Sequence, residues 1–87
     1  MPTINVQGSG WHNVYALAGI EVGAGLYLQN QTSYTLIAVE SATQPAAGEN
    51  GRWIYPTTEV QIDSGGPGLW IRPQSGTSIR AFVQERG

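Results

Sequence analysis

Few side chains in this sequence could do chemistry, and their types limit what the chain could catalyse. Histidine occurs once, as His12, and aspartate once, as Asp63. With a serine they could form a Ser-His-Asp arrangement, but no Gly-x-Ser-x-Gly turn accompanies them to present the nucleophile. A zinc site needs three or four ligands, and the chain has no cysteine and no second histidine. We therefore expect neither a catalytic triad nor a metal site.

Carboxylates and glycines offer two further kinds of site. Glycoside hydrolysis needs two placed acids around a cleft, whereas most acids here alternate with apolar residues, as side chains on the solvent face of a strand do. The acids are Glu21, Glu40, Glu49, Glu59, Asp63 and Glu85. Gly-x-Gly occurs at 8–10 and 23–25, but neither copy continues as a dinucleotide or phosphate-binding motif. The sequence thus predicts no enzyme activity and no cofactor.

Charge is sparse along the whole chain. Charged residues make up 11% of the 87, against about 25% in typical soluble domains. The net charge is −2 and lysine is absent. A nucleic-acid partner would require a basic face to neutralise phosphates, so we expect no nucleic-acid binding. No apolar run approaches the roughly 20 residues that span a bilayer, and no targeting segment is evident, so we expect no membrane association.

The size of the chain makes self-association attractive. A domain this small buries a limited share of its surface, and small domains commonly add disulfides, metals or oligomerisation. Without cysteine and without a metal site, oligomerisation remains. Low charge combined with 40% hydrophobic residues also favours a surface that something else covers. We expect the chain to assemble with copies of itself.

Short apolar runs between glycines and prolines predict the fold class. The 12 glycines and 5 prolines separate stretches rich in Val, Ile, Thr, Tyr and Trp, as in sandwiches or barrels of short strands. We predict one all-β domain of about seven or eight antiparallel strands, either a barrel or a sandwich. Strands are expected at 3–7, 12–17 (or a strand ending in a turn), 26–30, 34–40, 52–55, 59–63, 69–72 and 77–85. Residues 41–51 are expected to form an exposed loop.

Large side chains also fall on the second face of the predicted strands. Because side chains alternate, Trp70 points away from Leu69 and Ile71, and Phe82 points away from Ile79 and Val83. Aromatic residues and arginine are enriched in interface cores. We therefore predict an interface that contains Trp70, Arg72, Arg80 and Phe82. The alternative is that the aromatic residues cover the open ends of a barrel.

Carbohydrate binding is a second possibility from another class. Aromatic faces stack on sugar rings, and Asn, Gln, Asp and Arg supply hydrogen bonds. The candidates are Trp11, Trp53 and Trp70. A glycan therefore stays open as a ligand.

Several segments resemble small β-domain virion proteins of tailed bacteriophages. Residues 25–30 (Gly-Leu-Tyr-Leu-Gln-Asn) resemble a Y-x-(I/L)-Q-N strand of these proteins, and residues 36–41 resemble their next strand. Residues 45–51 are similar to the polar loop that follows, and 68–72 with 76–85 to a closing hairpin. The resemblance covers about residues 19–85. It implies a virion structural protein made in the host cytoplasm, most of all a capsid decoration (cement) protein that binds the major capsid protein or other virion proteins.

The same resemblance implies a homo-oligomer, with a trimer favoured. A neck, fibre or tail-tip domain is the alternative position in the particle. The family pattern carries no catalytic residue. Residues 1–18 match no part of it, so we treat them as an N-terminal strand or arm and residues 19–87 as the body. Trp11 and Tyr15 in this segment join the predicted interface as contacts to a neighbouring subunit or to the shell.

Overall fold

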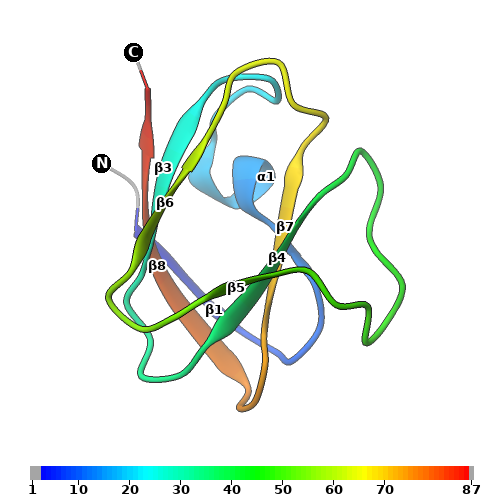
Figure 1. Cartoon of the computed structure of the whole chain (residues 1–87), viewed down its shortest axis with the longest axis vertical. Coiled ribbons are helices and arrows are strands. Elements are labelled where there is room, and N and C mark those ends of the chain that lie inside the picture. The colour runs from blue at the N-terminus through cyan, green and yellow to red at the C-terminus, as the bar shows by residue number, and fades with distance from the viewer. Residues whose placement is uncertain (1–2, 87) are drawn as a thin grey trace.

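Alternating apolar and polar residues form eight short strands and one helical turn in the computed structural model, which describes residues 3–86 (Figure 1). The strands are β1 (Thr3–Gln7), β2 (His12–Asn13), β3 (Leu26–Asn30), β4 (Leu36–Glu40), β5 (Arg52–Ile54), β6 (Glu59–Ile62), β7 (Leu69–Pro73) and β8 (Ser78–Glu85). The helix α1 spans Val14–Ala18. The predicted all-β class is confirmed.

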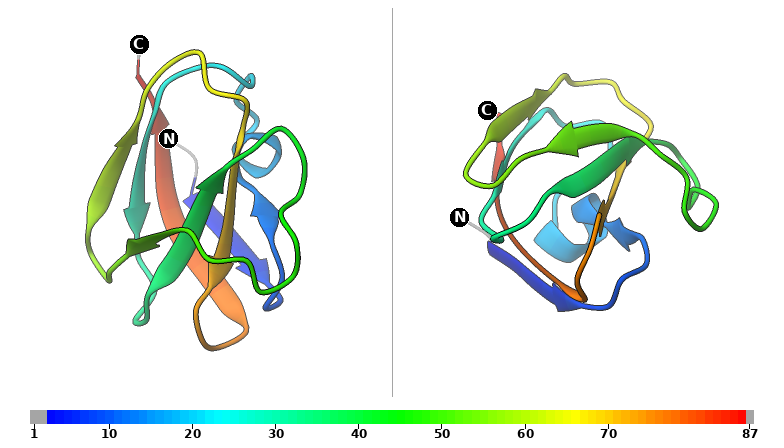
Figure 2. Two further views of the ribbon diagram at one scale, coloured as in Figure 1. Left: turned by 45° about the vertical axis from the view of Figure 1, so that its right-hand side comes forward. Right: turned by 60° about the horizontal axis from the view of Figure 1, so that its bottom comes forward.

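The strands form two four-stranded antiparallel sheets that face each other (Figure 2). Sheet A has the order β1-β8-β3-β6, and sheet B has the order β2-β7-β4-β5. The two sheets are not closed into a barrel, so the fold is the sandwich of the two alternatives. The last two strands do not pair with each other, so the expected closing hairpin is wrong. Strand β7 lies in sheet B beside β4, whereas β8 lies in sheet A between β1 and β3.

The core fills the space between the sheets and takes one set of alternating side chains from each strand. Leu26 and Leu28 are fully buried, as their spacing predicts, and belong to the same core cluster as the buried residues of β7 and β8. The core set is Ile4, Val14, Tyr15, Leu26, Leu28, Leu36, Ala38, Ile54, Ile62, Leu69, Ile71, Ile79, Ala81 and Val83. The outward set of each sheet is thereby left to form two outer faces.

The N-terminal segment is built into the sandwich rather than extended from it. Strand β1 pairs with β8, and β2 pairs with β7. The predicted strand at 12–17 ends after two residues, because the Asn13 side chain accepts a hydrogen bond from the Ala16 N–H and starts α1. Gly19 ends the helix with a φ of 70°, a conformation that glycine adopts without strain. Of the predicted N-terminal strand or arm, residues 3–18 thus form strands paired within the sandwich and the helix α1, and the first two residues lie outside the described part.

Asn30, the last residue of the Gly-Leu-Tyr-Leu-Gln-Asn segment at 25–30, ties the two sheets together. Its side chain is completely buried and donates to the carbonyls of Tyr34 and Ile54, each at 2.9 Å. Its Oδ1 accepts from the Thr32 N–H at 2.8 Å and from the Thr32 hydroxyl. Ile54 belongs to β5 in sheet B, so one amide links a strand of sheet A to the edge of sheet B. A buried polar group costs no stability when all its hydrogen bonds are made, as they are here.

Candidate functional site

The outer face of sheet A is an exposed surface of mostly uncharged polar side chains. Inward residues on β1, β8, β3 and β6 leave the alternate positions facing outward. The outward side chains are Thr3, Asn5, Gln7, Tyr27, Gln29, Glu59, Gln61, Ser78, Arg80, Phe82 and Gln84. Arg80 and Glu59 are the charged residues among them. We call this surface the contact face.

Two aromatic rings lie diagonally across the middle of the contact face. Phe82 on β8 is flanked by Thr3 on β1 and Gln29 on β3. Tyr27 lies opposite Gln84, two residues along from Phe82 on the neighbouring strand. Diagonal neighbours of this kind are roughly 7–8 Å apart, within reach of each other's large side chains. Both rings are partly exposed, so the face offers apolar area framed by amides.

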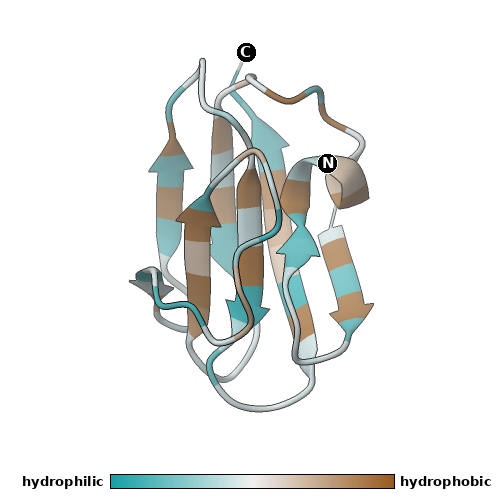
Figure 3. Ribbon diagram, turned by 90° about the vertical axis from the view of Figure 1, so that its right-hand side faces the viewer, coloured by the Kyte–Doolittle hydropathy of each residue, from teal (hydrophilic) through white to brown (hydrophobic). Residues whose placement is uncertain are grey.

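The outer face of sheet B is covered by the chain itself. All three tryptophan N–H groups donate to the segment 41–50: Trp11 to the Ala46 carbonyl at 2.9 Å, Trp53 to the Asn50 Oδ1 at 3.0 Å, and Trp70 to the Ser41 carbonyl at 3.1 Å. Figure 3 views the molecule from the side on which this segment lies across sheet B. The sequence predicts an exposed loop for residues 41–51. Most of their side chains are exposed, but their backbone is held at several points.

Arg72 completes this attachment. Its guanidinium donates to the Glu49 carbonyl at 3.0 and 3.3 Å and lies 5.2 Å from the centre of the Trp11 ring, a cation–π distance. Underneath, Ile37 is only 3% exposed although it points away from the main core. Trp11 is 7% exposed, and its ring N–H is bonded to the segment 41–51 that lies over it. The segment 41–51 therefore closes a second, smaller apolar cluster on the outside of sheet B.

These contacts divide the six residues predicted for the interface. Trp11, Trp70 and Arg72 hold the segment 41–51 within the chain. Tyr15 is 1% exposed in the main core, where its hydroxyl donates to the Ala24 carbonyl at 2.6 Å. Burial raises the pKa of the Tyr15 hydroxyl, and the negative charge of Glu40 adds to the effect. Arg80 and Phe82 lie together on the outer face of sheet A, on the side to which the alternation of side chains assigns them. That face also includes Tyr27, which the alternation with Leu26 and Leu28 already turned outward.

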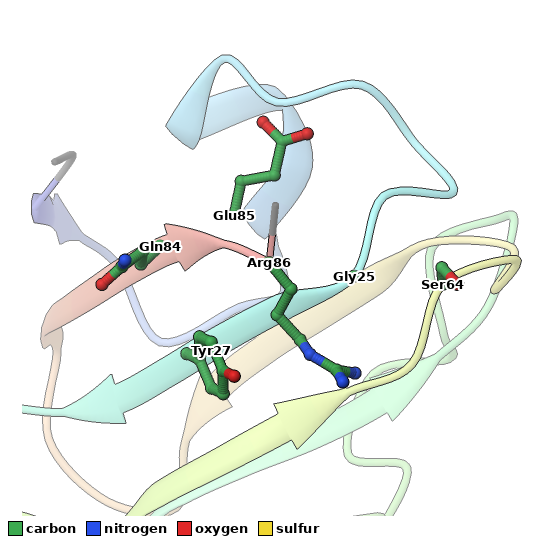
Figure 4. Close-up of a pocket in the computed structure, with 6 residues that line it drawn as sticks. All are labelled: Gly25, Tyr27, Ser64, Gln84, Glu85 and Arg86. Atoms are coloured by element: carbon green, nitrogen blue, oxygen red, sulfur yellow. The ribbon is translucent and has the colours of Figure 1, made fainter.

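A pocket of about 390 Å³ opens where the contact face meets the end of β8 (Figure 4). It is lined by Gly25, Tyr27, Ser64, Gln84, Glu85 and Arg86. Arg86 lies 5.6 Å from the centre of the Tyr27 ring and pairs with Asp63 at 3.2 Å. With the Gln61 amide assigned so that its oxygen faces Arg86, this oxygen accepts from the guanidinium at 2.7 Å. The Arg86 guanidinium is thus already paired with side chains of its own chain. The pocket forms a polar rim at the end of the contact face.

Exposed aromatic side chains also occur on β5 and just after it. Trp53 is 45% exposed and Tyr55 is 57% exposed. Both point away from the buried Ile54, so they lie on the same side of the chain. Of the three tryptophans considered for sugar binding, Trp53 is the one with an open ring face, since Trp11 is buried and Trp70 is half-buried.

The residues considered for metal binding and for His12 chemistry lie in the described part of the chain. Within residues 3–86, no group of three or more His, Cys, Asp or Glu side chains could hold a metal ion. The His12 Nε2 lies 3.1 Å from the Gly8 carbonyl, in a turn between β1 and β2. No helix of the described chain is long and apolar enough to cross a membrane.

The chain was also compared with protein-family models, with curated proteins and with solved structures, and none of the three comparisons finds a match.

Proposed function

We propose that this protein is a structural component of a tailed-phage particle and that it decorates the capsid through the contact face. The observation that carries the proposal is the composition of that face: two aromatic rings and one arginine among mostly uncharged amides and hydroxyls, with Glu59 as the acid on β6 and without lysine. Aromatic residues and arginine are enriched at protein interfaces, whereas lysine and acidic residues are depleted. The resemblance of residues 19–85 to phage virion proteins supplies the setting.

A cement role follows from such a face. A protein that binds only the assembled shell stabilises the shell in proportion to its affinity and free concentration. Phe82 and Tyr27 would bury apolar area against the shell, and Arg80 would reach a carboxylate or a carbonyl on it. Neck, fibre and tail-tip positions could use the same face, so the copy number in the particle decides between them.

Co-sedimentation with empty shells of the major capsid protein of the proposed phage tests the proposal. The Phe82→Ser variant should lose shell binding by at least tenfold, because an interface hot spot contributes about 2 kcal/mol or more. Val22→Ser is the matched control, since Val22 is exposed in the loop at 19–25, outside the contact face. Equal binding by the Phe82 variant and the wild type would contradict the contact-face assignment. Absence of binding by the wild type would contradict the cement role.

Sugar binding is a second candidate, supported by the exposed pair Trp53 and Tyr55. Aromatic rings on one side of an exposed strand can stack on a saccharide, and Asn50 and Arg52 lie beside them in sequence. Titration with soluble glycans should then change tryptophan fluorescence at millimolar to micromolar concentrations. The Trp53→Phe variant should lose most of the signal, while Trp70→Phe should keep it. No fluorescence change with any glycan would remove this candidate.

A further inference from the structure

The four edge strands of the sandwich differ in how open they are to another chain. Within the described residues, β2 has two residues, β5 has three and includes Arg52, and β6 has four and includes Glu59. Strand β1 has five residues (Thr-Ile-Asn-Val-Gln), with no charge, no proline and no glycine. Proteins usually protect a free edge by shortness, charge, proline or a bulge, because unpaired backbone groups invite another strand. Only β1 has none of these protections.

The hydrogen bonding of β8 shows which backbone groups of β1 remain free. The Gly8 N–H donates to the Thr77 carbonyl, and in an antiparallel ladder every second residue faces the same neighbour. The backbone N–H and C=O groups of Ile4 and Val6 therefore point toward β8, whereas those of Thr3, Asn5 and Gln7 point away from it. In agreement, the Arg80 carbonyl opposite Asn5 accepts from Gln31 on the β3 side. In Figure 3 no other segment lies beyond β1.

We propose that β1 pairs antiparallel with β1 of a second copy around a two-fold axis at Asn5. In this register Asn5 faces Asn5 of the second copy, Thr3 faces Gln7, and Ile4 faces Val6. Each of the pairs formed by Thr3, Asn5 and Gln7 exchanges two backbone hydrogen bonds. Polar side chains then meet polar ones outside, and apolar ones meet apolar ones inside. A two-fold interface brings each residue near its own copy, so a strand without charge avoids repulsion.

The pairing deepens the proposed function, on which it rests, by naming the chain's first partner. It joins two copies of sheet A into one continuous sheet and places their contact faces side by side. The assembly is then a dimer. The shell would meet a surface with two Phe82–Tyr27 pairs, and the doubled face would strengthen binding through effective concentration.

Sedimentation equilibrium over a range of concentrations tests the pairing without any shell. The wild type should show a reversible equilibrium between one and two chain masses. Asn5→Lys places two ammonium groups opposite each other and should raise the dissociation constant at least about fivefold. Gln29→Lys is the matched control, because it adds the same charge to the same face about 10 Å from the edge strand, beyond β8. It should leave the dimer unchanged while weakening shell binding, so the two proposals can fail separately.

A cysteine version keeps the test valid if Asn5→Lys lowers stability. The chain has no cysteine, so Asn5→Cys introduces the only thiol. Facing hydrogen-bonded residues have Cα atoms about 5.5 Å apart, which a disulfide can span. Asn5→Cys should form a disulfide dimer under mild oxidation much faster than Gln29→Cys does. A single-chain mass at every concentration, a trimer, or equal cross-linking of the two variants would overturn the pairing.

Discussion

Trp11 should contribute to the stability of the chain itself rather than to contacts with another molecule. The Trp11→Ala variant removes a side chain that is 7% exposed, that donates to Ala46 and that stacks on Arg72. Burial of about 200 Å² of aromatic surface contributes roughly 4–5 kcal/mol, of which an alanine retains part. The hydrogen bond and the cation–π contact add about 1 kcal/mol in total. We expect a loss of about 3–4 kcal/mol in the free energy of unfolding, within the range for such truncations.

The assay is unfolding by urea and by heat, followed by far-UV circular dichroism. This signal does not depend on the tryptophan that is removed. A domain of this size loses about 4–8 °C of Tm per kcal/mol, so the melting temperature should fall by at least about 12 °C. Trp53→Ala is the matched control: its ring is 45% exposed, and the change should cost about 1 kcal/mol. Trp11→Ala with wild-type stability and lost assembly would refute this reasoning and return Trp11 to the interface.

Three other expectations follow from single residues. Gly76→Ala should lower the free energy of unfolding by about 2 kcal/mol, because φ is +91° and a Cβ would lie 2.9 Å from the Tyr34 ring. Gly48→Ala is the control in the same urea assay. Gly48 also has a positive φ but lies in open space, so this variant measures the backbone cost alone. Asn30→Ala should cost about 3 kcal/mol or more, because it removes both donors from buried carbonyls and the acceptor of Thr32; a change below 1 kcal/mol would contradict its role between the sheets. The raised pKa of Tyr15 means that the folded state holds this proton more tightly than the unfolded state, so its stabilising contribution is complete below the ordinary value of 10.0 and is lost as pH rises above it. Thermal melts from pH 8 to 11 should show a steeper loss for the wild type than for Tyr15→Phe, and parallel curves would count against it.

Local patterns were enough to place most strands and their inward faces. The predicted bounds of β1 and β3 coincide with the structure. In each strand five alternating residues lie between turn residues, so a single register buries the apolar side chains. These are Ile4 in β1 and Leu26 and Leu28 in β3. Strand pairing was not accessible in the same way. The last two strands are close in sequence, yet β7 and β8 cross between the sheets, and nothing in their composition indicates this crossing.

The candidate site shows the same division. Alternation placed Arg80 and Phe82 outward, and the structure leaves them there. Alternation also placed Trp70 and Arg72 outward, but the segment 41–51 folds over them through hydrogen bonds that span 23 to 35 residues. An outward side chain is available to a partner only if no loop of its own chain covers it. That depends on long-range contacts, which neighbouring residues do not encode.

The most direct test of the proposed virion role is quantitative mass spectrometry of purified particles of the phage to which the proposal assigns the chain. The measurement is the number of copies of this protein relative to the major capsid protein. A cement protein that binds across the shell should be present in numbers comparable to the capsid subunits or capsomers. A few copies per particle would place the protein at the neck, fibre or tail tip instead. Its absence from intact particles would contradict the account.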